Sequence, residues 1–287
     1  MAKGAITGMT RVAAILGHPV GHSISPAMQN AAFKKLGMDV VYVPFEVAPA
    51  DLGAALKAVR AFGMIGVNIT IPHKVAVMRH LDKVDKAARL IGAVNTIVNR
   101  GGVLTGYNTD GEGYLKSLSD ETGFSPKGKT ALILGSGGAA RSIAVTLAMK
   151  GVGRIVIANR TITKARALTA LINKNFKGVA AMPCCSADAD MLRNVDLVVN
   201  TTSLGMKGKF VKQSPLFLAG VNPKAVISDI VYNPEMTVFL KDAKRRGLKI
   251  HKGLGMLIYQ GALGFGLWTG KAAPVAIMAR AAKKALR

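Results

Sequence analysis

The feature that most constrains this chain is the segment LILGSGGAAR at residues 132–141. An apolar run breaks into glycines and then resumes as an alanine-rich stretch, which predicts a strand, a tight turn and a helix. The spacing Gly135-x-Gly137-x-x-Ala140 matches the dinucleotide-binding fingerprint, with a small last residue that lets helix and strand pack closely. Such a turn leaves backbone N–H groups at the helix N-terminus free to bind a pyrophosphate. Glycine-rich turns without a nucleotide share this spacing, so the surrounding sequence must decide.

The predicted strand after this turn ends on Asn159, Arg160 and Thr161, which begin 24 residues beyond Gly135, and Lys164 follows one helical turn later. Enzymes that bind NAD usually place Asp or Glu near this position, where a carboxylate binds the ribose hydroxyls and repels a 2′-phosphate. Guanidinium and hydroxyl groups bind a phosphate instead, so this segment predicts NADP as the cofactor. The alternative is that Arg160 is an ordinary solvated residue at a strand end.

Short β-branched runs alternate with helix-like stretches on both sides of the turn. This alternation predicts βαβ units, mainly parallel sheets and the α/β class. The 287 residues suffice for two domains, and the clearest linker-like segment is 122–129. Two strand-like runs around residues 100–102 predict a hairpin at the edge of the first sheet. The strand candidates are residues 11–16, 40–47, 65–71, 130–135, 154–160, 196–202, 225–232 and 248–250.

The chain is strongly basic, with 39 Lys and Arg residues against 15 Asp and Glu and a net charge of +24. Binding to nucleic acid would concentrate this charge on one face or segment. The excess is instead spread along the chain, and each of the two domains predicted below carries +12. We therefore favour a generally basic surface that attracts anionic ligands over a surface that binds nucleic acid.

Neither a metal site nor a membrane segment is expected. Cys184 and Cys185 are neighbours without a CxxC motif or a His-rich tract, which predicts no disulfide framework, no metal site and a reducing, cytoplasmic setting. The apolar run 12–16 leads directly into Gly-His-Pro, which is typical of a strand and loop and not of a signal peptide. Residues 253–270 carry no charge, but six glycines and Gln260 make them a poor lipid-facing helix.

The segment His-Ser-Ile-Ser-Pro at residues 22–26 is a candidate site for a carboxylate. Ser23 and Ser25 place two hydroxyls just before a predicted helix start, where they and the backbone N–H groups can hold an anion. The alternative is a plain serine N-cap ahead of a first-turn proline, and the local pattern alone favours it.

A second candidate lies where the strand 65–71 ends. The alternation places Asn68 and Thr70 on one face, with Lys74 just beyond Pro72. The carboxyl end of a parallel strand is where ligands bind in α/β proteins. Taken one at a time, a lysine after a proline is commonly solvated. Asn95 and Asp110 are equally open to interpretation as strand-end and helix-cap residues.

Together these segments are far more specific than any of them alone, and the chain resembles the shikimate dehydrogenase family, NADP-dependent enzymes of aromatic amino-acid biosynthesis. The resemblance spans residues 17–270. It runs in order through HSISP, NITIPHK, GAVNT, NTDG, GSGGAAR, NRT, NTTSLGM, DIVYNP and GLGMLIYQGALGFGLWTG.

The resemblance implies how the substrate is bound and converted. The reaction it implies is reversible hydride transfer between the nicotinamide and the C3 carbonyl of 3-dehydroshikimate. Lys74 and Asp110 match the catalytic pair: the lysine ammonium protonates the carbonyl oxygen as hydride arrives, and Asp110 orients it. Ser23 and Ser25 match the residues that bind the substrate carboxylate. The residues that surround the ring hydroxyls in the family correspond in this chain to Asn68, Thr70, Lys74, Asn95, Asp110 and Gln260, with Tyr232 nearby.

The resemblance also implies the cofactor site. The pyrophosphate is assigned to Gly135, Ser136, Gly137, Gly138 and Ala139, and the 2′-phosphate to Asn159, Arg160, Thr161 and Lys164. Lys164 stands where many relatives have arginine, which keeps the charge and loses the bidentate grip on phosphate. The nicotinamide end is assigned to Thr202, Ser203, Ile230, Gly253 and Met256.

The implied architecture has two domains, with the active site in the cleft between them. Residues 1–109 and 253–287 form a mainly parallel α/β domain that binds substrate and carries the catalytic residues, and the C-terminal helices return to it. Residues 110–252 form the Rossmann-type NADP-binding domain. We expect a monomer or homodimer that acts on a small molecule, without nucleic-acid or membrane partners.

Two alternatives stay open at this stage. One is an NAD-dependent quinate/shikimate dehydrogenase, which would have an acidic or otherwise non-basic residue near position 159 or 160. The other is a catalytically silent module that binds a nucleotide or nucleic acid, which would need neither Lys74 nor Asp110. His73 and the overall basicity receive no role.

Overall fold

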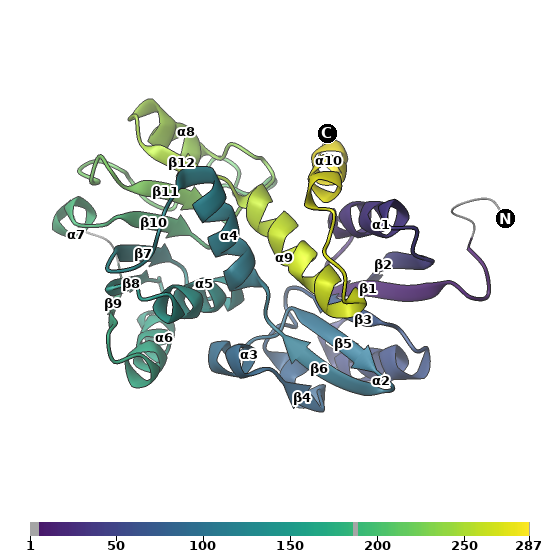
Figure 1. Cartoon of the computed structure of the whole chain (residues 1–287). Coiled ribbons are helices and arrows are strands. Elements are labelled where there is room, and N and C mark those ends of the chain that lie inside the picture. Colours follow the sequence, from purple (N-terminus) through teal and green to yellow (C-terminus); the bar gives the residue numbers. More distant parts are fainter. Residues whose placement is uncertain (1–5, 186–188, 287) are drawn as a thin grey trace. The chain divides into compact units, whose positions relative to one another are not determined.

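The computed structural model describes residues 6–185 and 189–286. Its contacts divide the chain into two compact units, Met1–Thr109 with Ile258–Arg287, and Asp110–Leu257. Each unit contains one six-stranded sheet with its own core (Figure 1). Helix α9 (Gly253–Thr269) begins in the second unit and ends in the first. The two units are described in turn.

The first sheet has the strand order β2-β1-β3-β5-β6-β4 and is mixed. The first strand pairs in parallel with β2 and β3, whereas β5 runs antiparallel to β3 and β6. The predicted hairpin is β5 and β6, but it is not at the edge, because the two-residue strand β4 pairs outside β6. The strands are β1 (Arg11–Gly17), β2 (Val40–Glu46), β3 (Gly66–Ile69), β4 (Lys83–Val84), β5 (Thr96–Arg100) and β6 (Val103–Tyr107).

Buried residues of α2 and α3 form one core cluster with residues of β1, β3, β5 and β6. Helix α1 packs against α10, the C-terminal helix (purple and yellow in Figure 1). The return of α9 depends on Gly66, where a Cβ atom would collide with the Ile97 carbonyl and the Trp268 ring. That space lets the Trp268 indole N–H donate to the Ile97 carbonyl at 2.9 Å. The α-helices are α1 (Ser25–Lys35), α2 (Leu52–Ala61), α3 (Lys86–Ile91), α10 (Val275–Ala285) and the second part of α9.

The second sheet is entirely parallel, in the order β12-β11-β10-β7-β8-β9. Three successive strands thus lie on one side of β7 and two on the other, the order of the dinucleotide-binding fold, and the order reverses between β7 and β10. Its central strands are buried; β7 is largely apolar, whereas β10 ends on Asn200 and β11 ends on Ser228 and Asp229. The strands are β7 (Thr130–Leu134), β8 (Arg154–Ala158), β9 (Ala180–Cys184), β10 (Leu197–Asn200), β11 (Val226–Asp229) and β12 (Lys249–His251).

Helices form the crossovers that join successive parallel strands, except between β10 and β11, where residues 201–225 contain no α-helix. Strand β9 was absent from the predicted strands, because its sequence AAMPC contains a proline and no β-branched residue. The α-helices are α4 (Asp110–Thr122), α5 (Gly138–Met149), α6 (Ile162–Asn175), α7 (Ala189–Arg193), α8 (Val238–Arg245) and the first turns of α9. Among the described residues, none of the helices has the length and apolar character needed to cross a membrane.

Candidate functional site

The turn between β7 and α5 is shaped to receive a phosphate. Gly135 has φ +110°, a conformation that L side chains rarely adopt, and its N–H donates to Ala158 O at 2.8 Å. Gly137 is exposed and is the N-cap of α5, with open space where a Cβ would lie. The first turn of α5 carries no acidic residue, so its N–H groups and helix dipole favour an anion. The loop fits the predicted pyrophosphate.

The turn lies at the point where the strand order reverses. A Cβ on Gly135 would lie 2.6 Å from the Thr201 hydroxyl, so the glycine lets the loops after β7 and β10 approach each other. The Thr201 hydroxyl donates to Leu134 O at 2.7 Å and joins the carboxyl ends of these strands. Ligands of open α/β sheets bind at such a reversal.

The basic segment after β8 is also accessible. Arg160 and Lys164 are exposed, and Lys164 lies in the first turn of α6, which has no acidic residue. The Asn159 side chain donates to Thr161 O at 2.8 Å and so holds the turn that presents Arg160. The positive charges of both side chains lie close to the N-terminus of a helix, where the helix dipole is also positive. A bound anion would offset this repulsion. The segment fits a 2′-phosphate.

The residues predicted at the nicotinamide end follow β10 and β11 and begin α9. Thr202 is half-buried and held by the Asn200 side chain, whereas Ser203 is exposed. A Cβ on Gly253 would collide with the Ile230 carbonyl, so the glycine lets the start of α9 lie against that backbone. Met256 is buried one turn later. These segments all belong to the second unit.

In the first unit, three predicted substrate residues meet in one buried cluster of amides. The Asn68 amide donates to Asn95 O at 3.2 Å, and the Asn95 amide donates to Gln260 Oε1 at 3.3 Å. Strand β5 lies antiparallel beside β3 with Thr96 opposite Asn68, which places Asn95 at the carboxyl end of β3. Gln260 reaches the cluster from α9, and Thr109 Oγ1 donates to its carbonyl at 3.0 Å. Such a cluster can exchange hydrogen bonds with a polyhydroxylated ring.

Tyr42 is a member of this cluster that no sequence motif indicated. Its buried hydroxyl donates to Asn68 Oδ1 at 2.7 Å. Asn68 also donates to Thr96 Oγ1 at 3.1 Å, so Tyr42 and Thr96 together fix the orientation of its amide. Because an amide oxygen has two lone pairs, Asn68 Oδ1 can accept a second hydrogen bond, from a ligand hydroxyl, in addition to that from Tyr42. Tyr42 lies on β2, two strands from Asn68, which is why the local pattern around Asn68 held no sign of it.

Lys74 follows a firmly held turn at the end of β3. His73 is buried and its Nε2 lies 2.7 Å from Val47 O, so the residue that received no role in the sequence anchors this turn. The His73 N–H donates to Thr70 O, and the Val94 N–H donates to Lys74 O at 2.8 Å. Lys74 itself is half-buried. The backbone on both sides of the lysine is therefore fixed next to the amide cluster.

The two serines of the candidate carboxylate site precede α1. Ser23 is half-buried and Ser25 is buried. The plain serine N-cap that the local pattern favoured is wrong: the N-cap is Ile24, and no side chain caps the helix. Ser23 Oγ instead accepts from the Ser25 N–H at 3.3 Å, which brings the two serines together at the helix N-terminus.

Asp110 and Tyr232 belong to the second unit. Asp110 is buried and is the first residue of α4, where its negative charge suits the helix dipole. Tyr232 is half-buried after β11, and burial raises the pKa of its phenol. Within residues 6–185 and 189–286 there is no group of three or more His, Cys, Asp or Glu side chains that could hold a metal ion.

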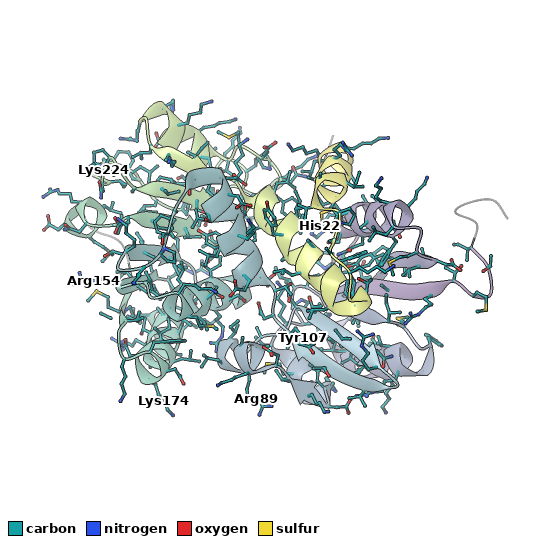
Figure 2. The ribbon with its side chains drawn as sticks, in the orientation of Figure 1. His22, Arg89, Tyr107, Arg154, Lys174 and Lys224 are labelled. Atoms are coloured by element: carbon teal, nitrogen blue, oxygen red, sulfur yellow. The ribbon has the colours of Figure 1, made fainter. Side chains whose placement is uncertain are left out.

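The basic charge is distributed over both units. Figure 2 labels four basic side chains, Arg89, Arg154, Lys174 and Lys224, each at the periphery of the unit that carries it, and all four are exposed. They come from a helix of the first unit and from three separate places in the second. In the sequence, too, the excess is not confined to one domain, because each of the two predicted domains carries a net charge of +12.

A parallel sheet with this strand order and a glycine turn at its reversal is the architecture of the dinucleotide-binding α/β proteins, and the first unit adds a buried cluster of hydrogen-bonding amides. Family models match three segments: a shikimate dehydrogenase substrate binding domain at residues 15–97, a shikimate/quinate 5-dehydrogenase at 118–214 and a shikimate 5′-dehydrogenase C-terminal domain at 253–283.

Individual relatives match nearly the whole chain. The NADP(+) shikimate dehydrogenase of Moorella thermoacetica is 50% identical, over 98% of this chain and 95% of its own. A crystal structure of a shikimate dehydrogenase in complex with NADP+ is 41% identical with a TM-score of 0.92, and covers 100% of this chain and 99% of its own. The Thermus thermophilus enzyme in complex with NADP(H) and shikimate is 39% identical with a TM-score of 0.86, and covers 96% and 100%.

The chain belongs to the shikimate dehydrogenase family. The predictions of an α/β fold, of an oxidoreductase of this family and of NADP as its cofactor are confirmed. The roles of individual residues stay predictions.

Proposed function

We propose that this chain catalyses the reversible reduction of 3-dehydroshikimate to shikimate with NADPH, a step of aromatic amino-acid biosynthesis. The observation that carries the proposal is the buried amide cluster of Asn68, Asn95 and Gln260, in a chain whose other unit has a phosphate-binding turn followed by Arg160 and Lys164. A polyhydroxylated acid suits the first set of groups, and a dinucleotide with a 2′-phosphate suits the second.

One set of residues binds the substrate carboxylate, and another set binds its ring hydroxyls. Ser23 and Ser25, at the N-terminus of α1, hold the carboxylate with hydroxyl and backbone N–H groups. The other substrate-binding residues are hydrogen-bonding groups suited to the ring hydroxyls: Asn68, Thr70, Lys74, Asn95, Asp110, Tyr232 and Gln260. The orientation that Tyr42 and Thr96 impose on Asn68 reduces the entropy lost when the ring binds.

Lys74 and Asp110 carry the proton chemistry. Bound NADPH supplies the hydride that reduces the C3 carbonyl. The carbonyl oxygen becomes negative as the hydride arrives, so the Lys74 ammonium stabilises it and donates the proton that completes the hydroxyl group. In the reverse direction the lysine amine accepts that proton. Asp110, as a carboxylate, orients the ammonium and accepts a hydrogen bond from a neighbouring substrate hydroxyl.

The second unit holds the cofactor. The turn Gly135, Ser136, Gly137, Gly138 and Ala139 binds the pyrophosphate, and Asn159, Arg160, Thr161 and Lys164 bind the 2′-phosphate. Thr202, Ser203, Ile230, Gly253 and Met256 hold the nicotinamide end. The proposed NADP-binding domain comprises residues 110–252, and the proposed substrate domain comprises residues 1–109 and 253–287. Gly253 and Met256, in the first turn of α9, lie just beyond this boundary, although the contacts of the chain assign them to the second unit. The enzyme acts in the cytoplasm as a monomer or homodimer.

The test of the proposed function is an assay of shikimate and quinate, each against NADP and NAD. We expect oxidation of shikimate with NADP to have the highest kcat/KM of the four combinations. A clear preference for NAD would contradict the cofactor assignment, and a preference for quinate would contradict the substrate assignment. Absence of turnover with every pair would favour a silent binding protein.

Removal of both phosphate-binding cations should change the selectivity for the cofactor. We expect Arg160→Ala with Lys164→Ala to raise the KM for NADP at least tenfold, because each charge-assisted hydrogen bond to phosphate contributes about 1.5–3 kcal/mol. The KM for NAD, which lacks the phosphate, should change by less than about twofold. Steady-state kinetics with both cofactors measure the effect. Lys174→Ala, at an exposed position on the same helix, is the matched control. Equal losses with both cofactors would place the 2′-phosphate elsewhere.

A further inference from the structure

Asp229 is a buried carboxylic acid to which the proposed reaction gives no role. It is the last residue of β11 and is 0% exposed. Three donors surround its carboxylate: Asn200 Nδ2 and the Val231 N–H lie 3.0 Å from Oδ1, and Thr237 Oγ1 lies 2.7 Å from Oδ2. Every one of these groups donates to the acid, which is the arrangement expected around an ionised carboxylate.

The ionised form is costly at this position. All three donors are neutral, and burial raises the pKa of Asp229 to about 6, although the three hydrogen bonds act in the opposite direction. A buried charge without a charged partner destabilises a fold relative to a neutral side chain of the same shape. An asparagine would occupy the same space without this cost. Stability therefore gives no reason for an acid here.

The carboxylate reinforces the orientation of Asn200. A carboxylate can only accept hydrogen bonds, so Asp229 strengthens the orientation that the Thr202 N–H and the Leu204 carbonyl also require, with the NH2 group of Asn200 towards the acid. The amide oxygen of Asn200 accepts from the Thr202 N–H at 3.0 Å and from the Thr202 hydroxyl at 2.7 Å, while the NH2 group also donates to Leu204 O at 3.0 Å. The acid thus fixes the loop after β10 through one intervening side chain.

The same carboxylate fixes the loop after β11. The Val231 N–H bond to Oδ1 closes a turn around Ile230. The Ile230 N–H donates to Asn200 O at 3.1 Å, and the Ile230 carbonyl lies against Gly253, where a Cβ would collide with it. Asp229 is therefore connected to Thr202 on one side and to Ile230 and Gly253 on the other.

We propose that Asp229 is a positioning residue, which fixes Thr202 and Ile230 at the nicotinamide end of the cofactor site and is retained for this purpose although a neutral residue would be at least as stable. The proposal rests on the assignment of Thr202, Ile230 and Gly253 to the nicotinamide under the proposed function. Asp229 itself touches neither substrate nor cofactor.

The test is Asp229→Asn in the full chain. An asparagine must keep its oxygen at the Val231 N–H and turn its NH2 group to Thr237, so Asn200 retains an acceptor, but a neutral amide oxygen binds its NH2 group more weakly than a carboxylate does. We expect the thermal midpoint to stay within about 2 °C of wild type or to rise, because the desolvation cost of the charge is removed. In the NADP-free protein, amide hydrogen exchange in the segment 201–206 should become at least about fivefold faster. The kcat should fall about tenfold or more, with the KM for shikimate within about twofold.

Two control variants separate positioning from stability. Asp196→Asn changes an acid that precedes β10, at the opposite end of the strand, where it accepts from the Thr130 N–H at 2.9 Å, and it should leave both exchange and kcat unchanged. Thr237→Val removes one hydrogen bond from Asp229 but leaves the Asn200 contact in place. It should lower the thermal midpoint by several degrees without a fall in kcat.

The outcomes distinguish this proposal from the proposed function. A large loss of stability or a failure to fold in Asp229→Asn would show a structural role and overturn the proposal. Unchanged exchange at 201–206 together with unchanged kcat would also overturn it, while the proposed function would stand. If wild type does not turn over shikimate with NADP, the proposed function fails, and the exchange experiment on the NADP-free protein still decides whether Asp229 fixes the loop.

Discussion

Lys74→Ala lowers kcat for shikimate oxidation by about 10²-fold or more, with the KM for shikimate changed by less than about threefold, because proton transfer by a positioned side chain contributes about 10²–10⁴-fold and is realised mainly in the transition state. The backbone around position 74 is held by the Val94 N–H and by the turn that His73 anchors. The substitution therefore removes the ammonium and leaves the turn in place. Steady-state kinetics at saturating NADP measure both parameters.

A lysine of the same unit provides the control for this experiment. Lys57 is exposed on α2, so Lys57→Ala changes the charge of the first unit equally and should leave kcat unchanged. A second check is the thermal midpoint of Lys74→Ala, which should stay close to wild type because the side chain is only half-buried. Near-normal turnover in Lys74→Ala would remove the lysine from the mechanism. A large rise in the KM for shikimate with an unchanged kcat would show that the lysine contributes to substrate binding only.

The cofactor turn could be predicted from the sequence because the information that defines it is local. An apolar strand, the glycine at φ +110° and the small residues of the following helix lie within ten residues, and the structure has β7 ending at Leu134 and α5 beginning at Gly138. The basic residues after β8 could be predicted equally well, because one helix and one strand separate them from the turn. Both features can be recognised without knowledge of the rest of the fold.

The amide cluster could not be predicted in this way. Asn95 and Gln260 are separated by 165 residues, and they meet only because β5 runs antiparallel beside β3 and α9 packs on the same unit. Neither fact follows from the pattern around either residue, so the resemblance to a family was the only route to this pairing. Tyr42, which no motif contains, was missed altogether. Its role is decided by strand order, which hydrophobic periodicity does not specify.

The local sequence pattern gave wrong predictions for the cap of α1 and for the edge of the first sheet. The serine expected to cap α1 is replaced by Ile24, and Ser23 bonds to the backbone two residues on, because a serine hydroxyl can satisfy either arrangement. The hairpin expected at a sheet edge is covered by β4, which is too short to have a periodic signal. Such outcomes depend on small differences in energy between two local structures.

Buried polar residues of the second unit were also missed, and His251 is the clearest case. It is 0% exposed on β12, with Ser228 Oγ 2.8 Å from Nδ1 and Ser117 Oγ 2.8 Å from Nε2. Because Ser117 donates to Glu121 Oε1 at 3.0 Å, it accepts from Nε2–H, and Nδ1 of a neutral imidazole then accepts from Ser228. Tyr114 completes the chain by donating to Ser228 at 3.0 Å. A neutral imidazole satisfies the whole network, and burial favours this form.

The consequence is a measurable dependence of stability on pH. Burial lowers the pKa of His251 to about 4 from the ordinary 6.5. The unfolded chain therefore takes up a proton at 6.5 that the folded chain accepts only near 4, so this residue's contribution is complete above pH 6.5 and is lost as pH falls towards 4. At about 1.4 kcal/mol per pH unit the loss amounts to about 3 kcal/mol.

Asp229 contributes with the opposite sign. Its folded pKa of about 6 lies above the ordinary 3.8, so the folded chain holds a proton that the unfolded chain has released. The stability associated with the protonated acid is complete below pH 3.8 and is lost as pH rises through 6, again by about 3 kcal/mol. Between pH 4 and 6 the two residues therefore offset each other in the wild-type protein, and their effects become visible only when one of them is replaced.

The two variants should diverge on acidification. For each protein, the free energy of unfolding at pH 4 is compared with its own value at pH 7.5. Relative to the change in wild type, we expect the value for His251→Gln to be higher by about 3 kcal/mol and that for Asp229→Asn to be lower by a similar amount. Urea unfolding at a series of pH values, followed by a probe in the second unit, measures both. His22→Gln, at an exposed position, is the control and should follow the wild-type curve. If the His251→Gln curve also runs parallel to wild type, the imidazole is already protonated in the folded chain. The hydrogen-bond directions from Tyr114 to Glu121 would then have to be reversed in part, since a charged imidazole donates from both nitrogens.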